Sequence, residues 1–346
     1  MESRHHPRLV ISTDVTHTCG VNHRYRSLVV LLLVLGVVTA CGSAAKPGAP
    51  STSAAAPRPL GVLDPAPAPS AGGASAPACD PRASLRPQGA LPAPGAMPAG
   101  STMSRILARG RLIVGADQNA YLMGFRDPST GQLNGFDIEI ARQIAKAIFG
   151  NPDAVQFRAI NAADRIPMIQ SGDVDMVVRD MTITCARLQQ VAFSTDYLDA
   201  PQRLLVDKGS GFKTMADMGG KKVCAATGSI NIPVIQQAAS HPVAVAASNI
   251  LDCLVLLQQG EIQGVSTDDV GLIGLAAQDP NTEVVGGPLN DNPIGVAMKK
   301  DATDLVRFVN GVLDKIRADG TWTAIYQRWL AAGGTVPAPP AAQYLD

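Results

Sequence analysis

A carboxylate could bind in residues 173–187, where an apolar strand meets a short helix. Residues 174–178 form an apolar run of strand type, and polarity returns at Arg179. Thr184 is a suitable N-cap, which places Arg187 in the first turn of the helix that follows. Free N–H groups at a helix N-terminus and a guanidinium together can bind one carboxylate. The alternative is an ordinary cap followed by a surface arginine.

Acidic residues follow two other predicted strands. Asp117 comes after the turn and strand of residues 110–115, and Asp268 ends the strand of residues 263–268. The alternation of strands and helices along the chain predicts an α/β fold with largely parallel sheets and right-handed crossovers. Ligands of such sheets bind beyond the carboxyl ends of the strands. Asp117 and Thr182 both fall at such ends, so they lie where a ligand is expected.

The elements that must position these residues are predicted from apolar periodicity and capping residues. Asp137 is expected to cap a helix that ends at Gly150, and residues 337–346 are expected to fray. The further predicted strands are 155–160, 204–206, 219–226 and 294–298. The predicted helices are 104–109, 137–149, 167–170, 185–191, 231–239, 250–259, 305–316 and 322–330.

Composition excludes several classes of function. The chain has 346 residues, and its 29 Lys and Arg residues balance 29 Asp and Glu residues, so no basic field indicates nucleic acid. Aromatic residues make up 4 %, too few for a base-stacking platform. Neither GxGxxG nor GxxxxGK[ST] occurs, which argues against a nucleotide site, and no cofactor is predicted.

The first 40 residues have the features of an export leader. Arg24 and Arg26 precede a continuous apolar run at 28–38, which is too short to span a bilayer. The run ends in Val-Thr-Ala-Cys, which resembles a lipobox and predicts a lipid on Cys41. Residues 42–100 are rich in Ala, Pro, Gly and Ser, so residues 41–100 are predicted to be a lipidated cysteine and an unfolded tether.

Several motifs together resemble a known family. Asp-Val-Asp at 173–175, Met-Thr-Ile-Thr at 181–184 with Arg187, Val-Ala-Phe-Ser at 191–194 and Gly-Phe-Asp at 135–137 carry the resemblance. They are similar to the amino-acid branch of the bacterial extracellular solute-binding proteins, family 3, the two-lobed receptors of ABC importers. The resemblance covers residues 106–330. It implies the type II periplasmic-binding-protein fold, with two α/β lobes joined by a two-strand hinge.

The resemblance also implies a set of ligand-binding residues. Thr182 and Arg187 match the pair that holds the α-carboxylate of an amino acid, and Asp268 matches the acid that pairs with its α-ammonium. The remaining matches are a loop acid with an aromatic ring and a second loop of small residues: Asp117, Phe125, Thr227, Gly228 and Ser229. Ile230 departs from the family, which has a small or hydroxylated residue there.

The implied organisation is a leader (1–40), a tether (41–100), lobe 1 (101–204 with 295–334), lobe 2 (205–294) and a tail (335–346). The expected protein is a monomer on the extracytoplasmic face of the cell membrane, held there by its lipid alone. Its expected partners are an amino acid and either the permease of an ABC importer or a membrane sensor.

Four cysteines remain besides the one in the leader and Cys41. They allow three pairings, and an even number in an exported protein favours two disulfides. We expect Cys224–Cys253, because both residues fall in lobe 2, which leaves Cys79–Cys185. The alternative is a metal site, but no CxxC motif or paired histidine accompanies these cysteines.

Ligand specificity depends on Arg179, which stands where the family often has a small residue. Arg179 could bind a side-chain carboxylate, which favours glutamate and aspartate over glutamine and asparagine. It could instead form a surface ion pair with Asp180. Two other functions remain as alternatives: a structural lipoprotein, and an enzyme of the same fold such as a cyclohexadienyl dehydratase. The enzyme would need a cleft Glu or Lys as acid or base, and no catalytic residue is predicted.

Overall fold

The computed structural model describes residues 56–68 and 78–346. The predicted leader and Cys41 lie outside the described residues. Contacts divide the chain at residue 54, and the description below concerns the unit Ala55–Asp346.

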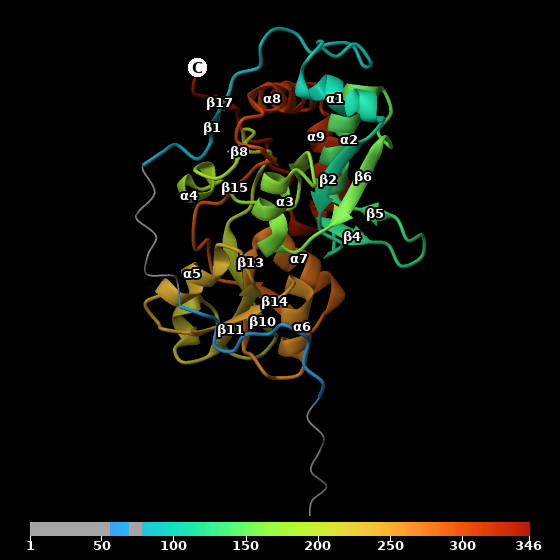
Figure 1. Ribbon diagram of the computed structural model, residues 1–346. Coiled ribbons are helices and arrows are strands. Elements are labelled where there is room, and N and C mark those ends of the chain that lie inside the picture. The colour runs from blue at the N-terminus through green and yellow to red at the C-terminus, as the bar shows by residue number, and fades with distance from the viewer. Residues whose placement is uncertain (1–55, 69–77) are drawn as a thin grey trace, which may run out of the picture. The chain divides into compact units, whose positions relative to one another are not determined.

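The first of two five-stranded sheets carries the residues singled out in 110–187. Its strands β2 (Leu112–Ala116) and β6 (Val155–Ala159) run parallel, side by side (Figure 1). The strand order is β6-β2-β7-β16-β8, with β7 at Met176–Val177, β16 at Ala297–Met298 and β8 at Ala192–Phe193. β7 is parallel to β2, whereas β16 is antiparallel to both β7 and β8. We call this sheet and its helices lobe 1.

The helices of lobe 1 bury apolar stripes against this sheet. In α2 (Phe136–Phe149) the stripe is Ile140, Ile144 and Ile148, and Gly150 ends the helix in the left-handed conformation that glycine favours. The other helices are α1 (Thr102–Arg109), α3 (Arg165–Ser171), α4 (Cys185–Leu188), α8 (Thr303–Ala318) and α9 (Thr321–Trp329). Short additional elements are β3 (Asn119–Ala120), β4 (Gly124–Arg126), β5 (Leu133–Asn134) and the 3₁₀ turns Ala162–Asp164 and Ala331–Gly333.

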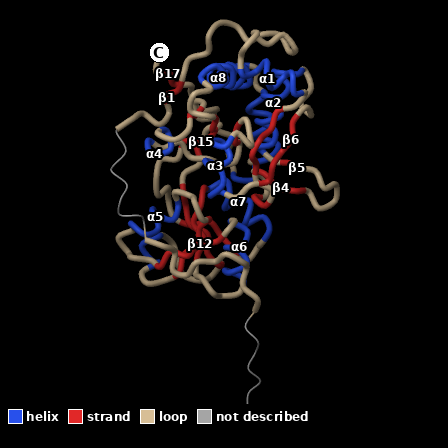
Figure 2. The backbone as a smooth tube through the Cα atoms, viewed as in Figure 1, coloured by secondary structure: helices blue, strands red, loops and turns tan. Residues whose placement is uncertain are grey.

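The second sheet is built from the middle of the chain and, with its helices, is called lobe 2. Its order is β12 (Val243–Ala247), β11 (Lys222–Ala226), β13 (Gly264–Asp268), β10 (Gln202–Asp207) and β14 (Thr282–Val285). Figure 2 shows α5 (Asn231–Gln237) and α6 (Ile250–Gln258) beside these strands. One face packs on α6 and α7 (Asp269–Gln278), the other on α5 and the 3₁₀ turn Met215–Met218.

Two antiparallel strands carry the chain between the lobes. β9 (Leu198–Asp199) leaves lobe 1 and pairs with β15 (Pro293–Ile294), which returns to it. β10 already belongs to the second sheet, so the predicted boundary at 204–205 falls inside a strand. The prediction of largely parallel sheets holds for β2, β6 and β7 and for β11, β12 and β13. It fails for β10 and β16, because strands that arrive from the other lobe run the opposite way.

Local predictions were wrong at several helix and strand ends. Gly135, not Asp137, is the N-cap of α2, and Asp137 lies buried in the first turn. Asp268 occupies the N-cap position of α7, and Asp269 is the first residue of that helix. β7 has two residues and α4 has four, both shorter than predicted.

The predicted unfolded tether is wrong for residues 56–68 and 78–100, which pack on the lobes. Leu63 forms an antiparallel bridge with Ala246 of β12, with mutual N–H···O bonds of 2.8 and 2.9 Å. The Asp64 carboxylate accepts from Lys222 Nζ at 2.7 Å. β12 is therefore covered on its outer side by a segment with little apolar periodicity of its own.

The C-terminal tail does not fray as predicted. β17 (Gln343–Tyr344) pairs in parallel with β1 (Ala83–Ser84), so the C-terminal segment is held on lobe 1 beside residues 83–84 (Figure 1). Arg86 Nε donates to the Asp346 carbonyl at 2.7 Å, and Tyr344 donates to Asp314 at 2.5 Å.

Both expected disulfides are present. Cys224 on β11 is bonded to Cys253 on α6, inside the core of lobe 2. Cys79, in the segment before β1, is bonded to Cys185 at the start of α4.

Candidate functional site

A small cavity lies between the two lobes, at the carboxyl ends of their strands. Its volume is about 40 Å³. Lobe 1 contributes Asp117, Ala120, Met123, Asp137, Ala162, Arg165, Arg179 and Asp180. Lobe 2 contributes Ala226, Ser229, Asn231, Ile250, Thr267, Asp268 and Gly271.

Arg187 does not line this cavity but lies next to Arg165, which does, and it is buried at 8 % exposure. Thr184 accepts from the Arg187 backbone N–H at 3.2 Å, as expected for the N-cap of α4. The guanidinium donates to the Thr182 carbonyl at 2.8 Å and, across the lobes, to the Gly228 carbonyl at 3.3 Å. Burial lowers the pKa of Arg187 to about 10, so the group stays protonated at neutral pH.

Arg165 is a second buried guanidinium that the sequence analysis missed. It lies at the start of α3 and is 3 % exposed. It donates to Ala162 O at 2.8 Å, to Asp180 O at 3.0 Å and, across the lobes, to Gly228 O at 3.2 Å. The same carbonyl therefore accepts from Arg165 and Arg187. Burial, followed by the neighbouring Arg187 and Arg179, lowers the pKa of Arg165.

Asp268 faces the cavity from lobe 2. The Nδ2 of Asn292 donates to its Oδ1 and also to the Ala200 carbonyl at 2.7 Å, which links the carboxyl group to both strands that cross between the lobes. Burial, and then the negative charge of Asp180, raise the pKa of Asp268 well above its ordinary value. Removing water from a carboxylate disfavours its charged form, so Asp268 needs a cation beside it to remain ionised.

Arg179 forms a buried ion pair with Asp117, at 2.6 Å. Arg179 Nε also donates to the Ile160 carbonyl at 2.8 Å, and Asp117 accepts from the backbone N–H of Asn119 at 2.9 Å. The suggested surface pair of Arg179 with Asp180 is therefore wrong on both counts: the partner is Asp117 and the pair is buried. The Arg179–Asp117 pair presents a hydrogen-bond donor and an acceptor side by side at the cavity wall.

Asp180 and Asp137 are two further buried carboxyl groups at the cavity. Asp180 has a positive φ of 41°, and its backbone N–H donates to Asp137 Oδ2 at 2.8 Å. The other oxygen of Asp137 accepts from the hydroxyl of Tyr197 at 2.7 Å. Burial raises the pKa of both acids, to about 8 for Asp137.

The remaining predicted residues are placed differently. Ser229 lines the cavity, whereas Thr227 and Thr182 do not. The ring of Phe125 packs edge-on against the rings of Tyr121 and Trp329, with centroid distances of 4.8 and 5.9 Å, and it does not line the cavity. The structure therefore brings together Asp117, Arg179, Ser229 and Asp268 at the cavity. Arg187, Gly228 and Phe125 do not line it, although Arg187 and Gly228 are bonded to each other across the lobes.

Asn231 is another lining residue that the sequence analysis missed. Its Nδ2 donates to Thr267 Oγ1 at 3.0 Å, while its buried Oδ1 has no partner among the described residues. Asn231 opens α5 directly after the Thr227–Ser229 loop, so the polar residue at a helix start was the available signal. Arg165 follows the strand β6 in the same way, after a short polar turn.

Two glycines allow the lobes to approach closely. A Cβ added to Gly228, whose φ is +79°, would lie 2.6 Å from the Cα of Ala163 in lobe 1. A Cβ added to Gly274 of α7 would lie 2.3 Å from the carbonyl oxygen of Tyr121. Both distances are too short for any side chain, so the contact between the lobes depends on glycine at these positions.

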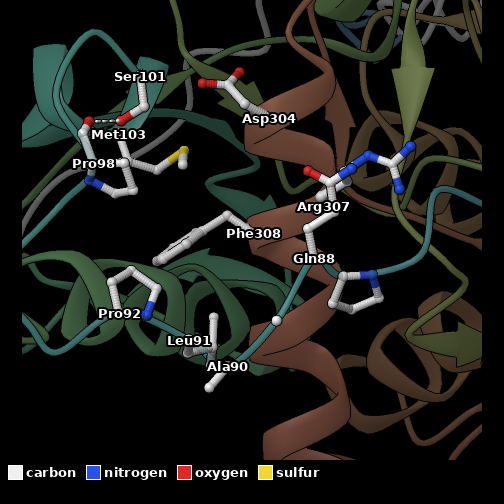
Figure 3. A pocket seen from close by; sticks show the side chains of 12 residues that line it. Gln88, Ala90, Leu91, Pro92, Pro98, Ser101, Met103, Asp304, Arg307 and Phe308 are labelled. Atoms are coloured by element: carbon white, nitrogen blue, oxygen red, sulfur yellow. Dashed lines mark hydrogen bonds between the residues drawn. The ribbon is translucent and has the colours of Figure 1, made fainter.

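A larger cavity, of about 320 Å³, lies away from this site between residues 87–98 and α8 (Figure 3). Its charged residues are already bonded elsewhere. Asp304 accepts from Thr102 at 2.6 Å, and Arg307 donates to Asp346 at 2.6 Å. None of the residues predicted to bind ligand lines it.

The described residues contain no cluster of three or more His, Cys, Asp or Glu side chains arranged to hold a metal ion. Among the helices in the described ranges, none has the length and apolarity that a bilayer span requires.

Comparisons with known proteins agree with this architecture. Residues 112–332 match the family described as bacterial extracellular solute-binding proteins, family 3. The ABC transporter glutamine-binding protein GlnH of Bacillus subtilis (strain 168) is 36 % identical over 230 residues, which is 66 % of this chain and 84 % of that protein. The glutamate-binding protein GluB of Corynebacterium efficiens is 26 % identical, covering 67 % of this chain and 81 % of that protein.

Solved structures give the same fold. An ancestral arginine-binding protein bound to glutamine has a TM-score of 0.60 and 32 % identity, covering 64 % of this chain and 98 % of that one. A solute receptor for L-cysteine of Neisseria gonorrhoeae has a TM-score of 0.64 and 26 % identity, covering 67 % of this chain and 94 % of that one. The fold is thus that of the type II periplasmic amino-acid-binding proteins, and the chain belongs to the bacterial extracellular solute-binding proteins, family 3.

Proposed function

We propose that this protein is an extracytoplasmic receptor for an acidic L-amino acid, which it delivers to an ABC importer or presents to a membrane sensor. The observation that carries the proposal is the burial of Arg187 and Asp268 on opposite lobes, within electrostatic range of each other, with Asp268 at the cavity and Arg187 next to the cavity residue Arg165. A zwitterion has one charge for each of them.

In the proposed binding mode the ligand replaces contacts between the lobes. Its α-carboxylate takes the place of the Gly228 carbonyl as acceptor for Arg187, with Arg165 beside it. Its α-ammonium supplies the cation that the desolvated Asp268 requires. Each lobe binds one end of the ligand, so occupancy favours the closed arrangement over an open one.

The size of the cavity implies that binding needs movement. About 40 Å³ has room for about one water molecule, far less than an amino acid occupies. We therefore expect the lobes to separate about the crossing strands β9 and β15 before a ligand can bind. The predicted lobe ranges, 101–204 with 295–334 and 205–294, are the proposed moving bodies.

The balance of charge at the cavity supports an acidic side chain. The guanidiniums of Arg165 and Arg179 line it, and that of Arg187 lies next to Arg165. Of the carboxyl groups, Asp117 is paired with Arg179, and burial raises the pKa of Asp137 to about 8. Asp180 and Asp268 are buried and face each other, and burial raises the pKa of both, which disfavours their charged forms. Positive charge is therefore in excess here, which a zwitterion leaves unbalanced and a side-chain carboxylate offsets.

Glutamine is the second candidate ligand. The Arg179–Asp117 pair offers one donor and one acceptor side by side, which suits a carboxamide. The B. subtilis relative is named for glutamine, and the Corynebacterium relative for glutamate. No comparable observation favours an enzyme, since the described residues that line the cavity include no glutamate, lysine or histidine.

The proposed location follows from the N-terminal sequence. We propose that residues 1–40 are removed on export and that Cys41 carries the lipid that anchors the protein outside the cell. Labelling of cells with a radioactive or clickable fatty acid, comparing wild type with Cys41→Ala, tests the anchor. Equal labelling of the two would exclude it.

Calorimetric titration with glutamate, aspartate, glutamine and asparagine tests the ligand assignment. We expect the two acids to bind more tightly than their amides, and Arg187→Ala to weaken binding of all four. Equal or tighter binding of glutamine overturns the acidic preference and leaves the receptor function standing. Unchanged binding in Arg187→Ala overturns the proposed carboxylate site.

A further inference from the structure

Arg187 is carried by a helix that is too short to hold its own position. α4 has four residues, a single turn. An isolated turn of helix is not stable in water, because nucleation fixes several residues for one hydrogen bond. Something outside α4 must therefore fix the direction in which the guanidinium points.

The Cys79–Cys185 disulfide attaches α4 to a fixed part of lobe 1. Cys185 is the first residue of α4, next to its N-cap Thr184 and two residues before Arg187. Cys79 belongs to the segment 78–85, which we call the N-terminal brace. The bridge is thus the covalent link between this brace and the helix that carries Arg187.

The brace is itself held at several points. The hydroxyl of Ser84 donates to the Phe193 carbonyl at 2.7 Å, and Asn310 donates to Ser84 Oγ at 2.9 Å and to the Leu85 carbonyl at 2.8 Å. Ala83 and Ser84 also pair with β17. These contacts fix the brace on β8 and α8, so the disulfide joins α4 to a rigid part of lobe 1 rather than to a flexible segment.

One brace residue also binds the strands that cross between the lobes. The Arg82 guanidinium is bonded to Asp196, to Asp199 of β9 at 2.6 Å and, just before β15, to Asp291 at 2.6 Å. The brace therefore holds both strands that cross between the lobes through Arg82. Three residues earlier, it holds α4 through Cys79.

From this arrangement we propose that the Cys79–Cys185 bridge is a positioning element of the ligand site, which orients Arg187 for carboxylate binding. The inference rests on the proposed function, because it assumes that Arg187 binds the ligand. Its consequence is that ligand affinity depends on the oxidation of this one bridge.

The first test is calorimetric titration of Cys79→Ser/Cys185→Ser with L-glutamate and with L-glutamine. We expect Kd to rise at least fivefold for each amino acid that binds the wild type. The matched control, Cys224→Ala/Cys253→Ala, removes the buried bridge of lobe 2 and should lower Tm with Kd within twofold of wild type. A wild-type Kd in the first variant overturns the proposal.

The wild-type protein allows a test without substitutions. Cys79 is exposed, whereas Cys224 and Cys253 are fully buried, so a mild reductant without denaturant should open the Cys79–Cys185 bridge alone. Alkylation and mass spectrometry identify the free thiols. The selectively reduced protein should have the Kd of the double serine variant and recover on reoxidation. An unchanged Kd after selective reduction contradicts the proposal.

A double-mutant cycle separates positioning from general stabilisation. In an Arg187→Ala background, loss of the bridge should raise Kd by less than twofold, because the group that it positions is gone. An equal loss in both backgrounds overturns the positioning role. If Arg187→Ala alone binds like the wild type, the proposed carboxylate site is what fails.

Discussion

Asp268 combines a stability cost with the proposed binding role in one carboxyl group. Burial raises its pKa, so keeping it ionised at neutral pH disfavours the folded state that lacks a ligand. The same desolvation strengthens its attraction to an ammonium group. A neutral isostere should therefore separate the two effects.

Asp268→Asn is expected to weaken amino-acid binding by about 3–5 kcal/mol, more than a hundredfold, while Tm of the ligand-free protein stays level or rises. Asparagine keeps the oxygen that accepts from Asn292. Calorimetry and thermal melts measure the two quantities. Asp269→Asn is the matched control, because Asp269 is the adjacent carboxyl group and does not line the cavity. A larger binding loss in the control would move the ammonium site to Asp269.

The buried acids also predict how stability changes with pH. Asp137, Asp180 and Asp268 have raised pKa values, so the folded protein binds protons more tightly than the unfolded chain. The free energy of unfolding should then fall as pH rises from the ordinary carboxyl pKa near 4 towards about 8. Each such group contributes at most about 1.4 kcal/mol per pH unit.

Asp137→Asn should flatten this slope between pH 5 and 8. The amide resembles the protonated acid: its oxygen can accept from Asp180 N–H, and its nitrogen can donate to Tyr197. Urea unfolding at pH 5, 6, 7 and 8 measures the slope. Asp153→Asn, at an exposed carboxyl group, should leave it unchanged. Identical slopes in wild type and Asp137→Asn would contradict the assignment.

At the scale of elements, the loop between β11 and α5 determines how closely the lobes meet. Its Gly228 has a φ that favours glycine and no space for a Cβ against Ala163. Its carbonyl is also the shared acceptor for Arg165 and Arg187. Gly228 is therefore constrained in three ways: by its backbone conformation, by its close packing on Ala163 and by the two guanidiniums that donate to its carbonyl.

Gly228→Ala is expected to weaken ligand binding at least tenfold, because the added methyl group keeps the lobes apart. The control is Gly220→Ala, at a similar φ of +64° with no atom within 4 Å of the added Cβ. Both variants should lose about 1–2 kcal/mol of stability to the left-handed backbone, but only Gly228→Ala should lose affinity. Calorimetry and thermal melts check both, and equal Kd values for the two variants would refute the closure role.

Elements were predictable from sequence where their signals are local. Thr184 as a cap and Arg187 in the first turn follow from residues within one turn of each other. The misplaced start of α2 has a cause that is not local. Gly135, at φ 127°, packs so closely on the Met123 carbonyl that no Cβ would fit, and this constraint comes from another part of the chain. Arg165 escaped notice because its contact with Gly228 joins residues 63 positions apart.

At the scale of the whole molecule, chain segments with weak patterns are held by distant partners. Residues 56–68 and 337–346 have little apolar periodicity, so composition predicted a tether and a frayed end. They are ordered because they pair with β12 and β1, whose backbone N–H and C=O groups would otherwise lack partners. Such pairing depends on the folded partner and leaves no signature in the segment itself.

A chain ending at residue 336 tests the role of the tail. We expect the free energy of unfolding to fall by about 1–2 kcal/mol, from the lost β1–β17 pairing and the Tyr344–Asp314 hydrogen bond. Tm should fall by about 2–4 °C for each kcal/mol, with Kd unchanged. Equal Tm values for the truncated and full-length proteins would show that the tail contributes nothing.

The docking of residues 56–68 on β12 also limits how far the protein can stand from a bilayer. For a chain anchored through Cys41, as proposed, only residues 42–55 remain to bridge the gap, and fully extended they reach about 50 Å. A free chain from 42 to 100 would reach about 200 Å. The receptor would then work close to the lipid headgroups, within reach of a permease in the same membrane and unable to sample the outer layers of a cell wall.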